Sequence, residues 1–211
     1  MRKSAVTNGK PTEERLMEAA IGLFAARGYD ATSTKEICET AETNIASLHY
    51  HFKTKENLYR TIIQRFGELS LESAVRALQP PKTAAEVGVR LEIHLSGVLE
   101  TCLSNPDIFK IVQREIESPS IDGEDLFRGT LLKSHEALTK FLAQAIEKGF
   151  LTKEIEAPMA AGALWAQIGS IIRNDDINKK YFKHSIHETK YRAKWLQQTL
   201  HLFLKGCQKS S

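Results

Sequence analysis

The stretch TKEICETAETNIASLHYHF, residues Thr34–Phe52, predicts two short helices joined by a tight turn. Apolar residues recur three or four positions apart in each helix: Ile37 and Ala41 in the first, then Ile45, Leu48 and Phe52 in the second. Thr34 and Asn44 are the expected N-caps, because their side-chain oxygens can accept a free amide at a helix start. Only about three residues separate the helices, so they must cross steeply, as in a helix-turn-helix.

The second helix of this motif is predicted to stand free of the core and to present its outer face to a partner. Its outward residues are Ala46, Ser47, His49 and Tyr50. Small and hydrogen-bonding side chains on a protruding helix suit the major groove of DNA. We expect Ser47, His49 and Tyr50 to meet base edges or nearby phosphates.

Further residues in a fixed order surround the motif: Ala19-Ala20, Leu23-Phe24, Gly28-Tyr29, Thr32-Ser33, Ile37, Ala41, Leu48, His51-Phe52, Lys55 and Leu58. With them, the block from Glu13 to Leu58 resembles the DNA-binding domain of the tetracycline-repressor (TetR) family of bacterial regulators. Residues 44–52 are also similar to the CecR-like branch of that family. The chain departs from the family at four positions: Glu42, where Gly is usual, Thr43, Ala46 and His49.

The resemblance implies a DNA-binding set that extends beyond the outer face of the second helix. Thr34, His51 and Lys55 are expected to fix the DNA backbone, and Asn44 lies in the same set. A cation in the first turn of a helix opposes the helix dipole, so a phosphate beside Lys55 would explain its position. A solvated lysine is the alternative.

The rest of the sequence predicts helices and no strand, so the expected fold is all-α. A first helix is expected to open at Pro11 and to end at Gly28, which would cap it. The expected helices after the motif span about 54–78, 83–103, 105–118, 124–148, 158–173 and 186–204, with a polar loop at 174–183. Pro80-Pro81 marks the main break. The predicted domains are a flexible arm at 1–10, a three-helix DNA-binding domain at 11–58 and a helical-bundle domain at 59–211 for ligand binding and dimerisation.

The last two predicted helices are candidates for a homodimer interface, since one is apolar nearly all round and the other has a large aromatic face. The expected interface residues are Ala163, Leu164, Ile168, Ile171, Trp195, Leu196, Thr199, Leu200 and Phe203. TetR-family regulators are similar in dimerising through their last two helices. Filling the core of a monomer is the alternative that the residues leave open.

The helices between about 84 and 148 are expected to surround a pocket for a small, largely apolar effector. The candidate lining is Leu91, His94, Leu95, Ile111, Val112, Glu115, His135, Leu138, Trp165 and Gln167. Such a ligand can act as a switch only by favouring one conformation of the DNA-reading parts over another. The expected function is therefore a ligand-responsive regulator, a repressor that binds a palindromic operator as a dimer.

Composition limits the other classes of function. The formal net charge is only +3, and the excess lies at residues 173–211, with nine Lys and Arg against three Asp and Glu. Cys38, Cys102 and Cys207 lack metal spacing and are expected to be reduced thiols. With no signal-peptide pattern and no long apolar run, a cytoplasmic protein without membrane contact is expected.

No signature of an enzyme, a metal site or a cofactor site accompanies the motif. Catalytic residues, metal ligands and cofactors are therefore expected to be none. His184 and His187 are half a metal-binding pattern, for which an exposed loop is the simpler interpretation. An enzyme built on a helical bundle and a protein-interaction module remain the two rival classes.

Overall fold

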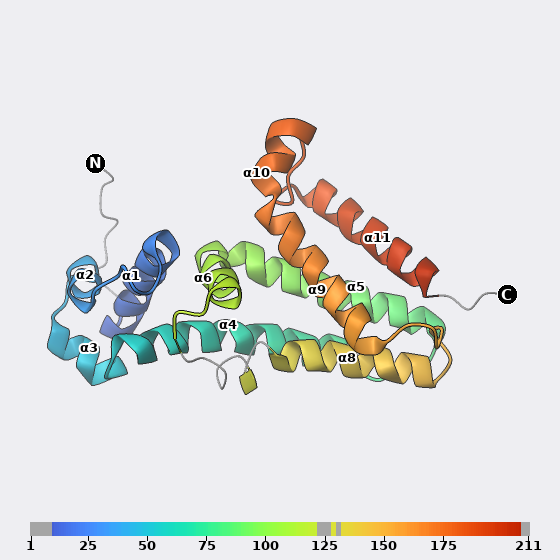
Figure 1. The fold of residues 1–211 in the computed structure, drawn as a ribbon, viewed down its shortest axis with the longest axis horizontal. Helices are drawn as coiled ribbons and strands as arrows, with labels where there is room; N and C mark the ends of the chain where they lie inside the picture. The colour runs from blue at the N-terminus through green and yellow to red at the C-terminus, as the bar shows by residue number, and fades with distance from the viewer. Residues whose placement is uncertain (1–9, 122–127, 130–131, 208–211) are drawn as a thin grey trace. The chain divides into compact units, whose positions relative to one another are not determined.

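The computed structural model of the chain describes residues 10–121, 128–129 and 132–207, and its regular elements there are helices (Figure 1). They are α1 (Thr12–Arg27), α2 (Thr34–Thr40), α3 (Ile45–Phe52), α4 (Lys55–Ala77), α5 (Ala84–Ser104), α6 (Pro106–Glu117), α8 (Leu132–Glu147), α9 (Ala157–Arg173), α10 (Asp175–Ile177), the π-helix η2 (Asn178–Phe182) and α11 (Thr189–Gly206). The prediction of an all-α fold with an N-terminal helix-turn-helix is confirmed. Most of the predicted arm, residues 1–9, and most of the first turns of the predicted helix 124–148 lie outside the described residues.

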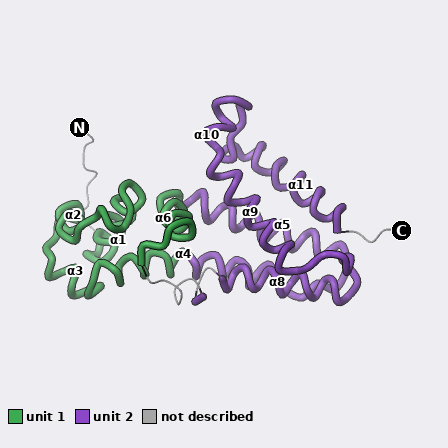
Figure 2. Tube along the Cα trace, in the orientation of Figure 1, with its two compact units in different colours: residues 1–66, 105–127 green, residues 67–104, 128–211 purple. Residues whose placement is uncertain are grey.

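The chain divides into two compact units (Figure 2). Unit 1 takes residues 1–66 and 105–127, and unit 2 takes residues 67–104 and 128–211. The helix-turn-helix lies in unit 1 together with α6, which comes from the middle of the chain. The boundaries 11–58 and 59–211 remain a prediction about domains.

An aromatic cluster forms the centre of unit 1. The ring of Tyr59 on α4 lies 5.0 Å from that of Phe24 in an edge-on contact and 4.9 Å from that of Tyr29. Leu16, Ile37 and Leu48 from the first three helices are fully buried around it. The helical spacing of apolar residues thus produces the expected three-helix core, and Gly28, with φ of 90°, ends α1 as predicted.

Polar contacts hold α6 in unit 1. The guanidinium of Arg114 donates to the carbonyl oxygens of Phe24 (2.8 Å) and Ala25 (3.3 Å) near the end of α1. These contacts place a cation at the carbonyl end of the helix dipole. The hydroxyl of Tyr59 donates to the carboxylate of Glu115 over 2.8 Å.

Three of the predicted effector-binding residues help to build the interior of unit 1. Ile111, Val112 and Glu115 are all buried there on α6. The other carboxylate oxygen of Glu115 accepts the amides of Ser120 (2.9 Å) and Ile121 (3.3 Å). The sequence pattern could not reveal these bonds, and a ligand contact at the three residues remains a prediction.

Unit 2 is a helical bundle in which α8 and α5 both pack against α9, and α5 also packs against α11. The residues buried inside unit 2 correct part of the predicted dimer interface. Five of the nine proposed interface residues are already buried inside one protomer: Leu164, Ile168, Leu196, Thr199 and Leu200. A side chain buried in its own chain has no apolar area left to bury against a partner. Of the remaining four, Ala163 is exposed, whereas Ile171, Trp195 and Phe203 are half-buried.

The predicted effector residues of unit 2 fall into two groups. Leu91, His94, Leu95 and Leu138 are buried, and His135 and Trp165 are half-buried with their rings 6.2 Å apart. Gln167 instead lies exposed on α9, where it lines a groove of about 180 Å³ with Trp195. A ligand contact at Gln167 remains a prediction.

The segment 174–183 is helical and not the predicted loop. Asp175 is buried, and its carboxylate accepts the amide of Ile186 (2.7 Å) and the hydroxyl of Ser185 (2.9 Å). Lys179 completes the arrangement with an ion pair of 2.9 Å to the same carboxylate. These contacts join the start of the segment to Ser185 and Ile186. The last helix is shorter than predicted, since it begins at Thr189 instead of near Ile186.

The three cysteines are buried and free. Cys38, Cys102 and Cys207 are unpaired and buried, and burial raises the pKa of each thiol, in Cys102 to about 12. They are therefore protonated at neutral pH, whereas redox sensing needs an acidified thiol.

Within the described ranges, no helix is apolar and long enough to span a bilayer, and no cluster of three or more potential metal ligands occurs.

We expect Tyr59→Phe to lower the free energy of unfolding by about 1–3 kcal/mol, because the buried carboxylate of Glu115 loses a hydrogen-bond donor. Denaturant unfolding followed by circular dichroism would measure the loss. Tyr50→Phe is the matched control, since it removes a hydroxyl from an exposed ring. Equal stability of the Tyr59 and Tyr50 variants would contradict the structural role of the Tyr59–Glu115 bond.

We also expect His94→Leu to remove a pH-dependent part of the stability. Burial lowers the pKa of His94 to about 4 from an ordinary value of 6.5, so protonation favours the unfolded chain. The contribution is complete above pH 6.5 and is lost as pH falls towards 4, where the wild type should have lost about 3 kcal/mol relative to the variant. Thermal unfolding at stepped pH, with the exposed His201→Leu as control, would measure it. Parallel pH profiles of wild type and His94→Leu would contradict the expectation.

Candidate nucleic-acid interface

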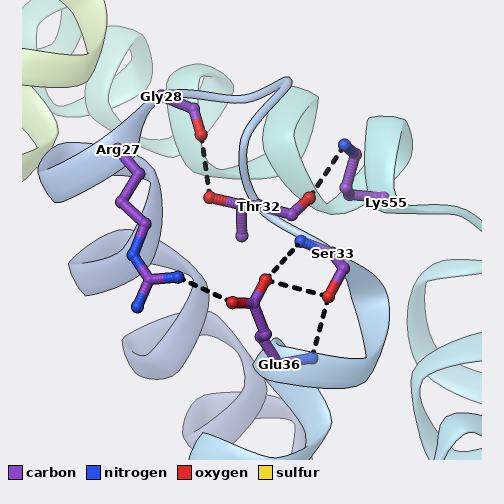
Figure 3. A network of polar contacts seen from close by, with 6 residues as sticks. All are labelled: Arg27, Gly28, Thr32, Ser33, Glu36 and Lys55. Carbon is purple, nitrogen blue, oxygen red and sulfur yellow. Dashed lines mark hydrogen bonds and ion pairs between the residues drawn. The ribbon is translucent and has the colours of Figure 1, made fainter.

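The start of α2 is fixed by a capping box (Figure 3). The hydroxyl of Ser33 accepts the amide of Glu36 (3.2 Å), and the Glu36 carboxylate accepts the amide of Ser33 (3.0 Å). Arg27 at the end of α1 donates to the other oxygen of that carboxylate over 2.6 Å. The prediction that Thr34 caps this helix is wrong, because Ser33 does so and Thr34 is the first helical residue.

Lys55 reaches back from the start of α4 to the α1–α2 connection (Figure 3). Its ammonium donates to the carbonyl oxygens of Tyr29 and Thr32, each at 3.0 Å, and lies 4.0 Å from the centre of the Tyr29 ring. Thr32 itself donates to the carbonyl of Gly28 (2.8 Å). An ammonium has three donors, and two of them serve the fold here.

The turn between α2 and α3 places Glu42 in the left-handed region, with φ of 50°. The next amide, that of Thr43, donates to the carbonyl of Cys38 (2.9 Å), which closes the end of α2. This is the position at which the resembling family usually has Gly, and only Gly adopts such a backbone without steric cost. The turn geometry is therefore kept despite the substitution.

Asn44 starts α3, as predicted. Its side-chain oxygen accepts the amide of Ser47 (2.9 Å) and the hydroxyl of Ser47 (3.1 Å). Both polar side chains are thereby used in part to fix the first turn of α3. Their groups lie at the end of the helix from which recognition helices contact base edges.

Two apolar side chains attach α3 to unit 1. Leu48 is fully buried and Phe52 nearly so. Ile45, predicted to join them, is instead 46 % exposed, because it lies at the first helical position, next to the turn. The opposite face of α3 presents Ala46, His49, Tyr50 and His51, all exposed, with Tyr50 the most open at 76 %.

Local contacts orient the side chains on this face. Nδ1 of His49 lies 2.6 Å from the carbonyl oxygen of Lys53, and because a carbonyl oxygen can only accept, that nitrogen donates the hydrogen bond and Nε2 stays open. Lys53 ends α3 with φ of 67°. The rings of Tyr50 and His51 meet edge-on at 5.0 Å. The exposed face therefore carries acceptors, donors and an aromatic ring in set orientations.

A family model described as "Bacterial regulatory proteins, tetR family" matches residues 16–62, which include α2, α3 and the start of α4. The chain carries a TetR-family DNA-binding domain. It is therefore a DNA-binding transcriptional regulator, and the prediction that it is a regulator and not an enzyme is confirmed. None of the similar proteins described below distinguishes the CecR-like branch.

Two curated relatives and one solved structure extend this similarity over most of the chain. The regulator UidR of Escherichia coli K12 is 26 % identical over 168 residues, which cover 78 % of this chain and 81 % of UidR. The uncharacterised regulator YvkB of Bacillus subtilis is 28 % identical over 205 residues, which cover 93 % and 97 %. FadR of Bacillus subtilis in complex with stearoyl-CoA has the same fold, with a TM-score of 0.72 at 16 % identity, covering 92 % of this chain and 98 % of FadR.

The structure brings the eight predicted DNA-binding residues to one region of unit 1. Asn44, Ala46, Ser47, His49, Tyr50 and His51 lie on α3 or its cap, and Thr34 and Lys55 lie at the starts of α2 and α4. Sequence reasoning missed Ser33 and Arg27, which hold α2. The sequence S-T-K-E at 33–36 does contain the capping-box pattern that would have identified Ser33.

We expect Glu42→Gly and Glu42→Val to change the stability in opposite directions. Glycine relieves a backbone strain of about 1–2 kcal/mol. It also gives the unfolded chain more conformational entropy, which offsets part of this effect, so a small increase in stability is expected. A β-branched residue at φ of 50° is strongly disfavoured, so Val should be less stable than Gly by about 1–3 kcal/mol. Thermal unfolding of both variants gives the difference, in which the loss of the Glu side chain cancels. Equal melting temperatures would contradict a left-handed Glu42.

Proposed function

We propose that this regulator binds a palindromic operator as a homodimer, represses transcription in the cytoplasm, and is released by a small, largely apolar molecule. The observation that supports this most directly is α3, where two buried residues, Leu48 and Phe52, hold an exposed polar and aromatic face. One such helix reads only a few base pairs. Two helices about 34–36 Å apart would read two half-sites on one face of the DNA.

The proposed contacts follow from the groups that α3 exposes. Tyr50 and His49 are the base-reading residues, with Ser47 beside them and Ala46 leaving room for a base methyl group. Thr34, His51 and the third donor of Lys55 take phosphates, together with the first turn of α3 at Asn44. These phosphate contacts would set the register of the helix in the groove.

The proposed dimer uses the outer surfaces of α9 and α11. Ala163, Ile171, Trp195 and Phe203 retain exposed area there, and Leu202 is largely exposed on α11. An isologous contact would bring the same surface of two protomers together. The five buried residues named above support this surface from beneath and do not form it.

The proposed effector site lies among the buried residues of α5, α8 and α9 in unit 2. Among the described residues, neither ring nitrogen of His94 has a hydrogen-bond partner, and neither does Nε1 of Trp165. Leaving a buried polar group unpaired costs free energy, so these groups would gain from a ligand with a matching polar atom. Leu91, Leu95 and Leu138 would supply apolar contact. The stearoyl-CoA bound by FadR illustrates an apolar chain with a polar end.

We expect Tyr50→Ala to weaken operator binding by about 5–150-fold at fixed salt, the equivalent of about 1–3 kcal/mol for one base contact. The footprint of the purified protein on the DNA beside its own gene would show the operator, and fluorescence anisotropy would give the affinities. Tyr50 is exposed, so circular dichroism should show an unchanged fold. Tyr50→Phe, the matched control, separates the hydroxyl from the ring.

Random DNA of equal length decides how Tyr50 acts. A base-reading residue loses more affinity on the operator than on random DNA, whereas a phosphate contact loses affinity evenly on both. Equal losses would remove the base-reading role of Tyr50. A footprint unchanged by Tyr50→Ala would contradict the proposed use of α3.

A further inference from the structure

A short helical arm separates α9 from α11 in unit 2. It consists of α10 and η2, residues Asp175–Phe182, and is called here the 175–182 arm (Figure 1). Three apolar side chains stand open on it: Ile177 at 52 %, Tyr181 at 64 % and Phe182 at 65 %. So much exposed apolar area in eight residues is a common mark of an interaction site.

The arm is built as a firm element despite its open side chains. The buried carboxylate of Asp175 is bonded to Ser185 and Ile186, which fastens the base of the arm to the segment before α11, and it pairs with Lys179 within the arm. A fixed projection loses little conformational entropy when it binds a partner. Its π-helical half is a rare geometry that is frequent at functional sites.

A groove on α11 lies next to the arm along the chain. It has a volume of about 490 Å³, and its aromatic wall is formed by Tyr191, Trp195 and His184, the last stacked on Tyr191 at 5.0 Å. Glu188, Lys190 and Lys194 also line the groove. We call it the α11 groove. The three open side chains of the arm do not fill the groove of their own chain, since each remains more than half exposed.

We infer that the 175–182 arm of one protomer inserts Ile177, Tyr181 and Phe182 into the α11 groove of a second copy of this chain. This inference rests on the homodimer of the proposed function and adds the arm to it. A protrusion and a receiving groove on one surface satisfy two-fold symmetry, because each copy can give its arm and receive the other. Trp195, one of the predicted interface residues, lies in the wall of the groove, so the arm would extend that interface.

Charge favours a second copy over an acidic partner. The arm carries two carboxylates and two ammonium groups, Asp175 and Asp176 against Lys179 and Lys180, so it is neutral overall. Lys179 is committed to Asp175, and the ammonium of Lys180 lies 5.0 Å from the Tyr181 ring. Exposed Asp176 can meet Lys190 or Lys194 of the groove. The arm is therefore better suited to insert its apolar side chains into a groove, with one ion pair at Asp176, than to attract an acidic partner.

The first test compares dimerisation of three full-length proteins by sedimentation velocity. Tyr181→Ser/Phe182→Ser should raise the dimer dissociation constant by about tenfold or more, as expected for losing central aromatic contacts. The matched control is Val89→Ser/Ile93→Ser, which removes two apolar side chains of similar exposure (57 % and 56 %) from α5. The control should dissociate like the wild type.

The second test asks where the arm binds. Differently tagged Phe182→Cys and Lys194→Cys proteins are mixed, exchanged and treated with a short bismaleimide, and a heterodimer linked between the tags is expected. Phe182→Cys mixed with Lys140→Cys, an exposed site on α8, should give none. The native cysteines are buried and should not react.

The outcomes separate the inference from the proposed function. A dimeric wild type, a weakened arm variant and the specific cross-link would support the arm. A dimeric wild type with an unaffected arm variant and no cross-link would overturn the arm and keep the dimer, and the arm would then face another partner. A wild type that stays monomeric at high concentration and on DNA would overturn both.

Discussion

An eight-residue helix cannot hold itself together in water, and that constraint governs the DNA-reading part of this protein. Helix nucleation is costly, and isolated helices of fewer than about 12 residues are marginal. α3 is therefore stabilised from outside its own backbone, by the Asn44 cap at one end and by burial of Leu48 and Phe52 beneath. The capping box at Ser33 and the aromatic core around Tyr59 serve the same end, since they fix the elements on which α3 lies.

The grouping of α6 with unit 1 follows from the same need. Three short helices bury little apolar surface by themselves. α6 adds Ile111 and Val112 to that core, and Arg114 donates to the carbonyl groups of Phe24 and Ala25 near the end of α1. A segment from the middle of the chain thus stabilises the N-terminal domain. A change in the position of α6 would therefore directly alter the contacts of α1.

The sequence was sufficient where structure is local and failed where it is not. The periodicity of Leu48 and Phe52, the cap at Asn44 and the stop at Gly28 each depend on a few neighbouring residues, so the motif and the all-α fold could be predicted. The helical arm at 175–182 could not, because it depends on Asp175 meeting Ser185 and Ile186 ten and eleven residues later. The same limit applies to α9 and α11, where an apolar pattern identifies buried residues but not whether its own chain or a partner covers them. Leu164 and Leu196 proved to be covered by their own chain.

The polar groups of the DNA-reading surface are divided between holding the fold and remaining open to a partner. Two donors of Lys55 and Nδ1 of His49 are bonded to backbone carbonyls, and a contact to DNA at those atoms would first have to break them. The ring of Tyr50 and Nε2 of His49 carry no such cost. Because a hydrogen bond that replaces another gains little net free energy, discrimination between bases should depend on the open groups. The bonded groups act earlier, by fixing the orientation in which the open groups meet the DNA.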